Sequence, residues 1–275
     1  MLTHMRKEIV LPVVAAAMGA AGFALRKWEL ASAFEADTGL PISGAPATGA
    51  LIVLSIAAAV ILFFLCRAGY RPFTGGYDAA FAAKGNTAYA AVSVLSAFLL
   101  LVSAVLMIRS FLLRENTMAT RLILALLCVI SFACILAGAK NNLRGEGKGK
   151  YSFILLMPAY MACMWLVVAY QARAADPVIL DYVYELFAII ASLLGLYFTA
   201  GFSFERPKVR RASFFSLLGV YFSIVTLADS HDLASMLLYG FAILYLISNT
   251  AVMLCNVRRC PPEENTEREG LPDEP

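Results

Sequence analysis

The chain has 275 residues, of which 61% are hydrophobic and 15% charged, with a formal net charge of +3. Its mean hydropathy of +0.76 lies far above that of soluble domains, in which about 25% of residues are charged. The stretches between the apolar runs are too short to form a separate soluble domain. This composition excludes an ordinary soluble enzyme or nucleic-acid-binding protein, and it indicates an integral membrane protein.

Eight apolar runs predict an all-α, polytopic bundle of membrane-spanning helices. They are Ile9–Leu25, Ala47–Cys66, Thr87–Ile108, Thr120–Gly138, Tyr151–Tyr170, Val178–Phe204, Ala212–Ala228 and Leu233–Cys255. Runs of about 20 apolar residues cross a bilayer as helices, because lipid cannot satisfy exposed backbone groups. We predict one transmembrane domain over residues 1–258, followed by an acidic, disordered cytoplasmic tail over 259–275.

The positive charges predict how the bundle is oriented in the plasma membrane. Alternate connections carry sixteen and six Lys and Arg residues, and the richer side faces the cytoplasm. Both termini are therefore predicted to be cytoplasmic. Arg6 and Lys7 before the Ala-rich first run also resemble a cleavable signal peptide. Because Arg26 and Lys27 follow directly, we favour a retained first helix.

Five polar residues predict an ion or solute mouth on the outer side. Asp181 and Glu185 share one helical face near the start of the sixth run, and the last outer turn contains Asp229, His231 and Asp232. One interpretation is a solvated pair at the headgroup level. The other is a working site that concentrates cations or, through a partly desolvated Glu185, couples to protons.

Polar side chains in the last two runs are candidates for lining a path through the bundle. They are Ser216, Ser223 and Thr226 in the seventh run and Asn249 in the eighth. Such groups also form hydrogen bonds between packed helices, so packing remains the alternative.

Arg26, Lys27 and Trp28 follow the first run and are predicted to anchor its outer end at the headgroups. A second possibility is that Arg26 or Lys27 reaches the Asp181–Glu185 pair and partly neutralises it. Small residues between Ala15 and Gly22 permit close helix packing, within the chain or in a homo- or hetero-oligomer.

The sequence carries no recognisable catalytic or cofactor motif. The six cysteines lack metal-type spacing, there are two histidines, and HExxH, GxSxG and nucleotide-binding loops are absent. We therefore predict no cofactor and no metal site.

Three function classes remain for a protein whose surroundings are the lipid bilayer. The first is a transporter or permease component for a small solute or a cation, and the second is a membrane-embedded sensor or accessory subunit. The third is an intramembrane lipid-modifying enzyme, which the missing motifs disfavour. A packed interior with an exposed small-residue face on the first helix would favour the accessory subunit, and a water-filled path would favour transport.

Overall fold

The computed structural model describes residues 7–35, 37–38, 40–67, 73, 76–114, 118–144, 152–174, 178–204 and 206–259. These residues form helices joined by short connections, and the only extended pairing among them is an isolated bridge between Phe34 and Pro41. The helices are α1 (Lys7–Ser32), α2 (Pro46–Arg67), α3 (Tyr77–Ala80), α4 (Thr87–Leu112), α5 (Ala119–Arg144), α6 (Ser152–Arg173), α7 (Ile179–Ala200), the 3₁₀ helix η2 (Gly201–Phe204), α8 (Val209–Thr226) and α9 (Leu233–Arg259).

The prediction of a helical, multi-pass membrane protein is confirmed. Of the described helices, α1, α2, α4, α5, α6, α7 and α9 are long and apolar enough to cross a membrane. The remaining predicted span, Ala212–Ala228, corresponds to α8, which carries Arg210 and Arg211 in its first turn and is not among these candidate membrane helices. Eight crossings and cytoplasmic termini therefore stay predictions. Of the predicted tail, Arg259 is the last residue of α9, and residues 260–275 lie outside the described residues.

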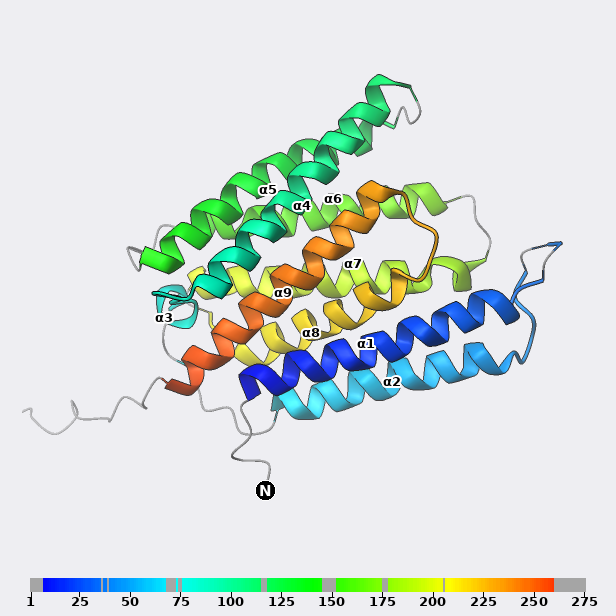
Figure 1. Ribbon diagram of the computed structural model, residues 1–275, viewed down its shortest axis with the longest axis horizontal. Coiled ribbons are helices and arrows are strands. Elements are labelled where there is room, and N and C mark those ends of the chain that lie inside the picture. The colour runs from blue at the N-terminus through cyan, green and yellow to red at the C-terminus, as the bar shows by residue number, and fades with distance from the viewer. Residues whose placement is uncertain are drawn as a thin grey trace, which may run out of the picture.

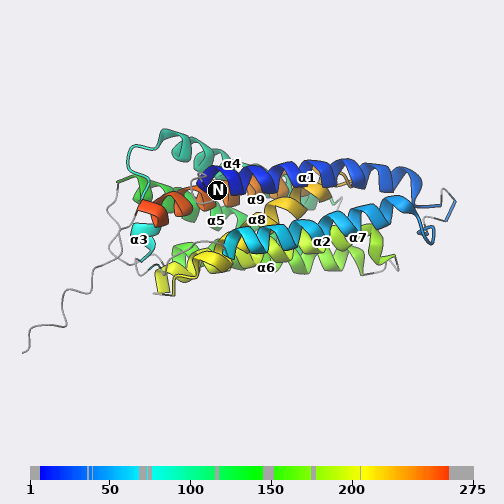
Figure 2. The ribbon, with the colours of Figure 1, turned by 90° about the horizontal axis from the view of Figure 1, so that it is seen from below.

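The long helices run side by side, with α8 inside the bundle (Figures 1 and 2). Helix α8 packs against α1, α2, α7 and α9, whereas α4, α5 and α6 form an outer group that joins the rest through α9 and α7. Successive long helices are antiparallel, so the connections alternate between the two ends of the bundle (Figure 1). We call these the Arg26 end and the Asn142 end after a residue at each.

Glycines bring α7 and α8 into backbone contact. A Cβ atom added to Gly195 would lie 2.9 Å from the Ser216 hydroxyl and 3.0 Å from the Ser216 Cα atom. Reciprocally, a Cβ atom on Gly219 would lie 2.9 Å from the Ser192 hydroxyl. Small residues permit this approach within a membrane bundle, and here they close the seam between the two helices.

Helix α1 lies equally close to α8. A Cβ atom on Gly22 would lie 2.6 Å from a methyl group of Val225, and one on Gly19 would lie 2.9 Å from Ile224. Arg26 comes one turn after Gly22, and the same face of the helix therefore carries it into the protein. The predicted span ended at Leu25, but the helix continues to Ser32, because the polar residues that follow Leu25 extend the helix without adding to its hydropathy.

Candidate functional site

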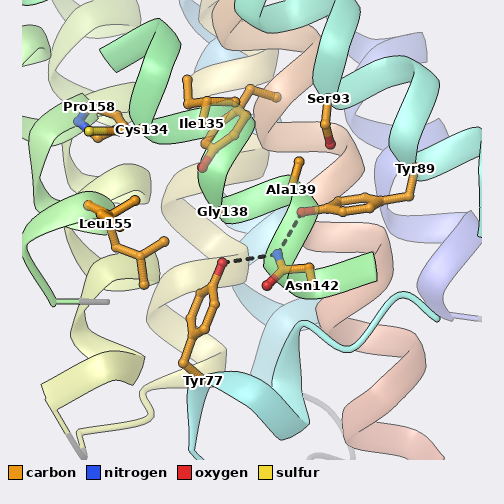
Figure 3. A pocket seen from close by; sticks show the side chains of 12 residues that line it. Tyr77, Tyr89, Ser93, Cys134, Ile135, Gly138, Ala139, Asn142, Leu155 and Pro158 are labelled. Carbon is orange, nitrogen blue, oxygen red and sulfur yellow. Dashed lines mark hydrogen bonds between the residues drawn. The ribbon is translucent and has the colours of Figure 1, made fainter. Parts of the chain in front are cut away.

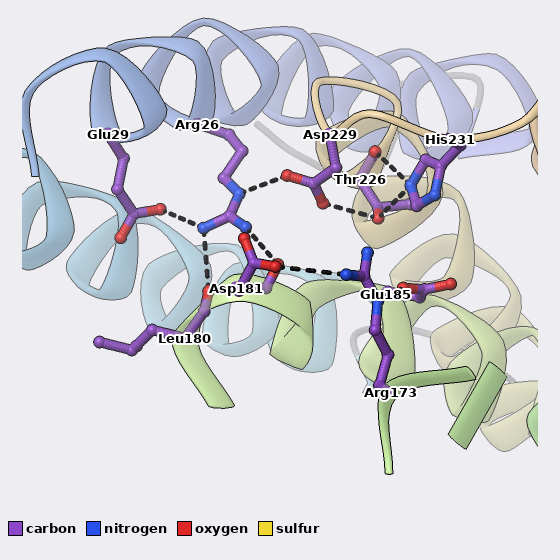
Figure 4. A network of polar contacts seen from close by, with 9 residues as sticks. All are labelled: Arg26, Glu29, Arg173, Leu180, Asp181, Glu185, Thr226, Asp229 and His231. Atoms are coloured by element: carbon purple, nitrogen blue, oxygen red, sulfur yellow. Dashed lines mark hydrogen bonds and ion pairs between the residues drawn. The ribbon is translucent and has the colours of Figure 1, made fainter. Parts of the chain in front are cut away.

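Arg26, on α1, is completely buried and joins three parts of the chain (Figure 4). Its Nε atom donates to Asp229 Oδ1 at 2.7 Å, and its Nη1 atom donates to Glu29 Oε2 at 2.7 Å. The guanidinium also donates to the backbone carbonyls of Leu180, at 3.1 Å, and Asp181, at 2.7 Å. Its carbon lies 5.2 Å from the centre of the Tyr184 ring, within the range of a cation–π contact. One side chain thus ties α1 to the start of α7 and to the α8–α9 turn.

A second arginine holds the carboxylates of α7 (Figure 4). Arg173, at the end of α6, contacts Asp181 at 3.3 Å and Glu185 at 3.4 Å. The Tyr239 hydroxyl of α9 donates to the other oxygen of Glu185 at 3.2 Å. Glu185 is only 8% exposed, so it is more enclosed than its predicted position at the outer boundary suggested. The three contacts fix this carboxylate between α6, α7 and α9.

These contacts form one cluster, which we call the Arg26–Arg173 network. Its members are Arg26, Glu29, Arg173, Asp181, Glu185 and Asp229. Two arginines face four carboxylates, so with all groups ionised the network has a formal excess of two negative charges. Glu29 Oε1 is buried and has no hydrogen-bond partner among the described residues. Arg26, Glu29, Glu185 and Asp229 are buried, whereas Arg173 and Asp181 are partly exposed. Burying charged groups in a membrane protein is costly, and it marks this cluster as the candidate functional site.

The turn after α8 completes the site with a hydroxyl and an imidazole (Figure 4). The Thr226 hydroxyl donates to Asp229 Oδ2 at 3.0 Å. His231 Nε2 lies 2.9 Å from the Thr226 carbonyl oxygen, which can only accept, so this nitrogen carries a proton. The His231 ring is centred 5.0 Å from the ring of Tyr239, the residue that donates to Glu185. The turn therefore contacts Arg26 through Asp229, and it contacts Tyr239, the partner of Glu185, through His231.

Asp232 lies at the rim of the site and pairs with Arg121, at the start of α5, and with Ser235. Burial by itself would raise the pKa of Asp232, but the Ser235 hydroxyl and the Arg121 charge together hold this pKa below its usual value. The turn at 226–232 is thus also linked to α5.

The structure brings together all five residues of the predicted mouth at the Arg26 end. Arg173, rather than Arg26 or Lys27, pairs with the carboxylates of Asp181 and Glu185. Lys27 and Trp28 are exposed on the opposite face of α1, where the predicted anchoring role stays a prediction. Sequence reasoning missed Arg173 and Tyr239 as partners. One signal could have shown that Arg26 points inward: it lies on the same helical face as Gly19, Gly22 and Glu29.

The predicted path-lining residues have separate surroundings. Ser216 lies against Gly195 in the closed α7–α8 seam, Thr226 belongs to the turn, and Ser223 is buried without a hydrogen-bond partner among the described residues. Asn249 accepts a hydrogen bond from the Tyr89 hydroxyl at 3.1 Å. Their role in a path stays a prediction.

A small polar pocket lies at the Asn142 end (Figure 3). The Asn142 amide donates to the hydroxyls of Tyr77, at 3.1 Å, and Tyr89, at 2.9 Å. The pocket between these side chains has a volume of about 10 Å³, which suits a single water molecule. Its lining comes from α3, α4, α5, α6 and α9, and it is too small for a solute.

No group of three or more His, Cys, Asp or Glu side chains is placed to hold a metal ion within the described part of the chain. Comparisons of the whole sequence with family models and with curated proteins, and of the structure with solved structures, give no match.

Proposed function

We propose that this multi-pass membrane protein is a permease, or a permease component, for a small cationic solute or an ion. In this proposal the Arg26–Arg173 network is the closed outer gate. The observation that carries the proposal is the complete burial of Arg26 between two carboxylates at the end of a membrane bundle. Ionisable groups inside a membrane bundle commonly mark substrate or ion pathways.

The charge balance of the network supports a cationic substrate. Four carboxylates share two guanidinium groups, so a bound monovalent cation would halve the formal excess of two negative charges and a divalent cation would cancel it. Field lines from an excess of carboxylates in a low-dielectric surrounding concentrate cations at such a site. The substrate would compete with Arg173 for Glu185. The contact between Arg173 and Glu185 is 3.4 Å long, and that between Arg26 and Asp229 is 2.7 Å long, so Glu185 is the more weakly held carboxylate.

The contacts of Arg26 also support a gate. Opening the Arg26 end requires the start of α7 to separate from α1 and from the 226–232 turn, and each of these joints passes through Arg26. The closed α7–α8 seam fits a conformation in which the path is shut. Transport would then proceed by rocking one helix group against another.

Uptake into liposomes tests this proposal. The full chain is reconstituted, and currents are recorded on a solid-supported membrane while inorganic cations, protons and small organic amines are offered in turn. We expect a current with at least one cation class, abolished by Glu185→Gln and retained by Glu8→Gln. Glu8 is the matched control because it lies at the Asn142 end, away from the network, and pairs with the exposed Arg258. Folded, correctly inserted protein that moves none of these cations would contradict the proposal.

A second candidate, an accessory subunit of a larger membrane complex, is favoured by the outward face of α1. Ala17, Ala20, Ala21 and Ala24 are all exposed there at the spacing of one helical face, which permits close approach of another helix. Purification from native membranes after cross-linking at an Ala21→Cys position distinguishes the two. A single stoichiometric partner that is lost in Ala20→Trp would favour the accessory subunit over an independent permease.

A further inference from the structure

A groove separate from the Arg26–Arg173 network lies between α2, α7 and α8. Its volume is about 600 Å³, within the roughly 300–1,000 Å³ typical of small-molecule sites. Most of its lining is apolar and aromatic, and consists of Phe63, Cys66, Leu194, Phe198, Phe214 and Phe215. The neighbouring Phe64 and Tyr197 are 63% and 55% exposed, so the groove opens on a surface that candidate membrane helices turn toward lipid.

The aromatic rings form a continuous wall across the three helices. The ring of Phe63 on α2 is centred 6.0 Å from that of Phe214 on α8. Phe214 lies 5.1 Å from Phe215, which stacks on Phe198 of α7 at 5.5 Å. These contacts give the groove a fixed apolar wall, which suits a hydrocarbon chain better than a polar ligand.

Three arginines stand at one end of this wall. Arg67 is the last residue of α2, four residues after Phe63, and Arg210 and Arg211 lie in the first turn of α8, four residues before Phe214 and Phe215. All three are exposed and line the groove. The Arg211 guanidinium carbon lies 6.0 Å from the centre of the Phe198 ring. No carboxylate is among the described residues that line the groove.

We propose that this groove binds one phospholipid with an anionic head group. Guanidinium groups bind phosphate oxygens in a bidentate manner, and the aromatic wall would hold the first part of an acyl chain. The arrangement places positive charge at the headgroup level, directly above apolar surface. This is the complement of an anionic lipid, and basic pockets between membrane helices commonly have this role. The inference does not depend on the proposed transport function.

Native mass spectrometry of the full chain in detergent tests the proposal. The protein is offered phosphatidylglycerol and phosphatidylcholine with identical acyl chains, in equal amounts. We expect one phosphatidylglycerol molecule to remain bound in clear preference to phosphatidylcholine. Equal retention of both lipids would overturn the proposal, because it would mean that the groove holds only bulk lipid. This comparison uses the unaltered protein and does not depend on the folding of any variant.

Matched variants separate the groove from the general basic surface. R67Q/R210Q/R211Q should weaken phosphatidylglycerol binding roughly 100-fold, since each basic residue near a headgroup contributes about 1 kcal/mol of binding free energy. K140Q/R206Q/K208Q removes the same charge from exposed positions at the same end of the bundle and should leave binding within about twofold. Equal losses in the two variants would overturn the proposal.

Two further arms test the shape of the site and the nature of its ligand. Leu194→Trp fills the groove without changing its charge and should also release the lipid, with the unfolding temperature as a check on folding. Millimolar inorganic phosphate or glycerol 3-phosphate should displace little phosphatidylglycerol. Complete displacement by either soluble anion would assign the arginines to a free anion and not to a lipid.

Discussion

Replacing Arg26 with glutamine tests the physical importance of the Arg26–Arg173 network. The substitution keeps a polar side chain but removes the positive charge that faces Glu29 and Asp229, each at 2.7 Å. Both carboxylates are buried and would lose their nearest cation. It also removes the donors that Leu180 and Asp181 accept from on α7, so the start of α7 would lose its tie to α1.

The expected loss follows from the burial of the pair. Removing one partner of a buried ion pair costs about 3–5 kcal/mol, because an uncompensated charge remains inside. For a chain of this size each kcal/mol corresponds to a few degrees, so the unfolding temperature should fall by roughly 10 °C. Lys27→Gln is the matched control, since Lys27 is the adjacent cation and is exposed. It should change the unfolding temperature by no more than about 2 °C.

Thermal unfolding in detergent, followed by tryptophan fluorescence and by the loss of the monodisperse chromatographic peak, measures both variants. A third variant, Arg26→Met with Glu29→Gln and Asp229→Asn, removes the buried charges together and should recover most of the loss. The reasoning is refuted if Arg26→Gln and Lys27→Gln unfold at the same temperature.

Two further predictions concern helix packing and the rim of the site. Gly195→Ala should destabilise the protein by about 1–3 kcal/mol, because its new Cβ atom would meet the Ser216 backbone at 3.0 Å. Gly49→Ala is the control, since a Cβ atom there has nothing within 4 Å, and it should be neutral or slightly stabilising. Equal unfolding temperatures for the two variants would contradict the closed seam. Asp232 has a lowered pKa, so its contribution should be present above pH about 4 and be lost as the pH falls through its folded-state pKa. Because the side chain is 48% exposed, Asp232→Asn should cost less than about 1 kcal/mol at pH 6. The unfolding temperatures of the unaltered protein and of Asp232→Asn are compared at pH 6 and at pH 3. A difference between the two proteins that is larger at pH 3 than at pH 6 would contradict the prediction.

The helical segments could be predicted from sequence because hydropathy reports directly on burial in lipid. The predicted run Ala47–Cys66 differs from α2 by one residue at each end, and Leu233 is the predicted and the observed start of the last helix. The errors lie at polar ends, where α5 continues from Gly138 to Arg144. The same holds at α8, where the predicted run began at Ala212 and the helix begins at Val209, with Arg210 and Arg211 in its first turn.

The site could be predicted only as a group of residues at one end. Alternation along the chain places Glu185 and the 229–232 turn at the same end, whatever the order of the helices. Which helices are neighbours depends on side-chain shape, such as the fit of Gly195 against Ser216, and one sequence does not reveal it. The pairing of Glu185 with Arg173 and Tyr239 depends on that neighbourhood and so could not be predicted.

The account depends on α8 crossing the bilayer, since only then does the Arg26–Arg173 network face outward and the basic end of the lipid groove inward. Lys208 and Ser230 flank α8, and both are exposed. In a background without native cysteines, Lys208→Cys and Ser230→Cys are treated in intact cells with a membrane-impermeant maleimide. We predict that Ser230→Cys is labelled at once and that Lys208→Cys is labelled only after permeabilisation. Labelling of both positions in intact cells, or of neither, would contradict the account.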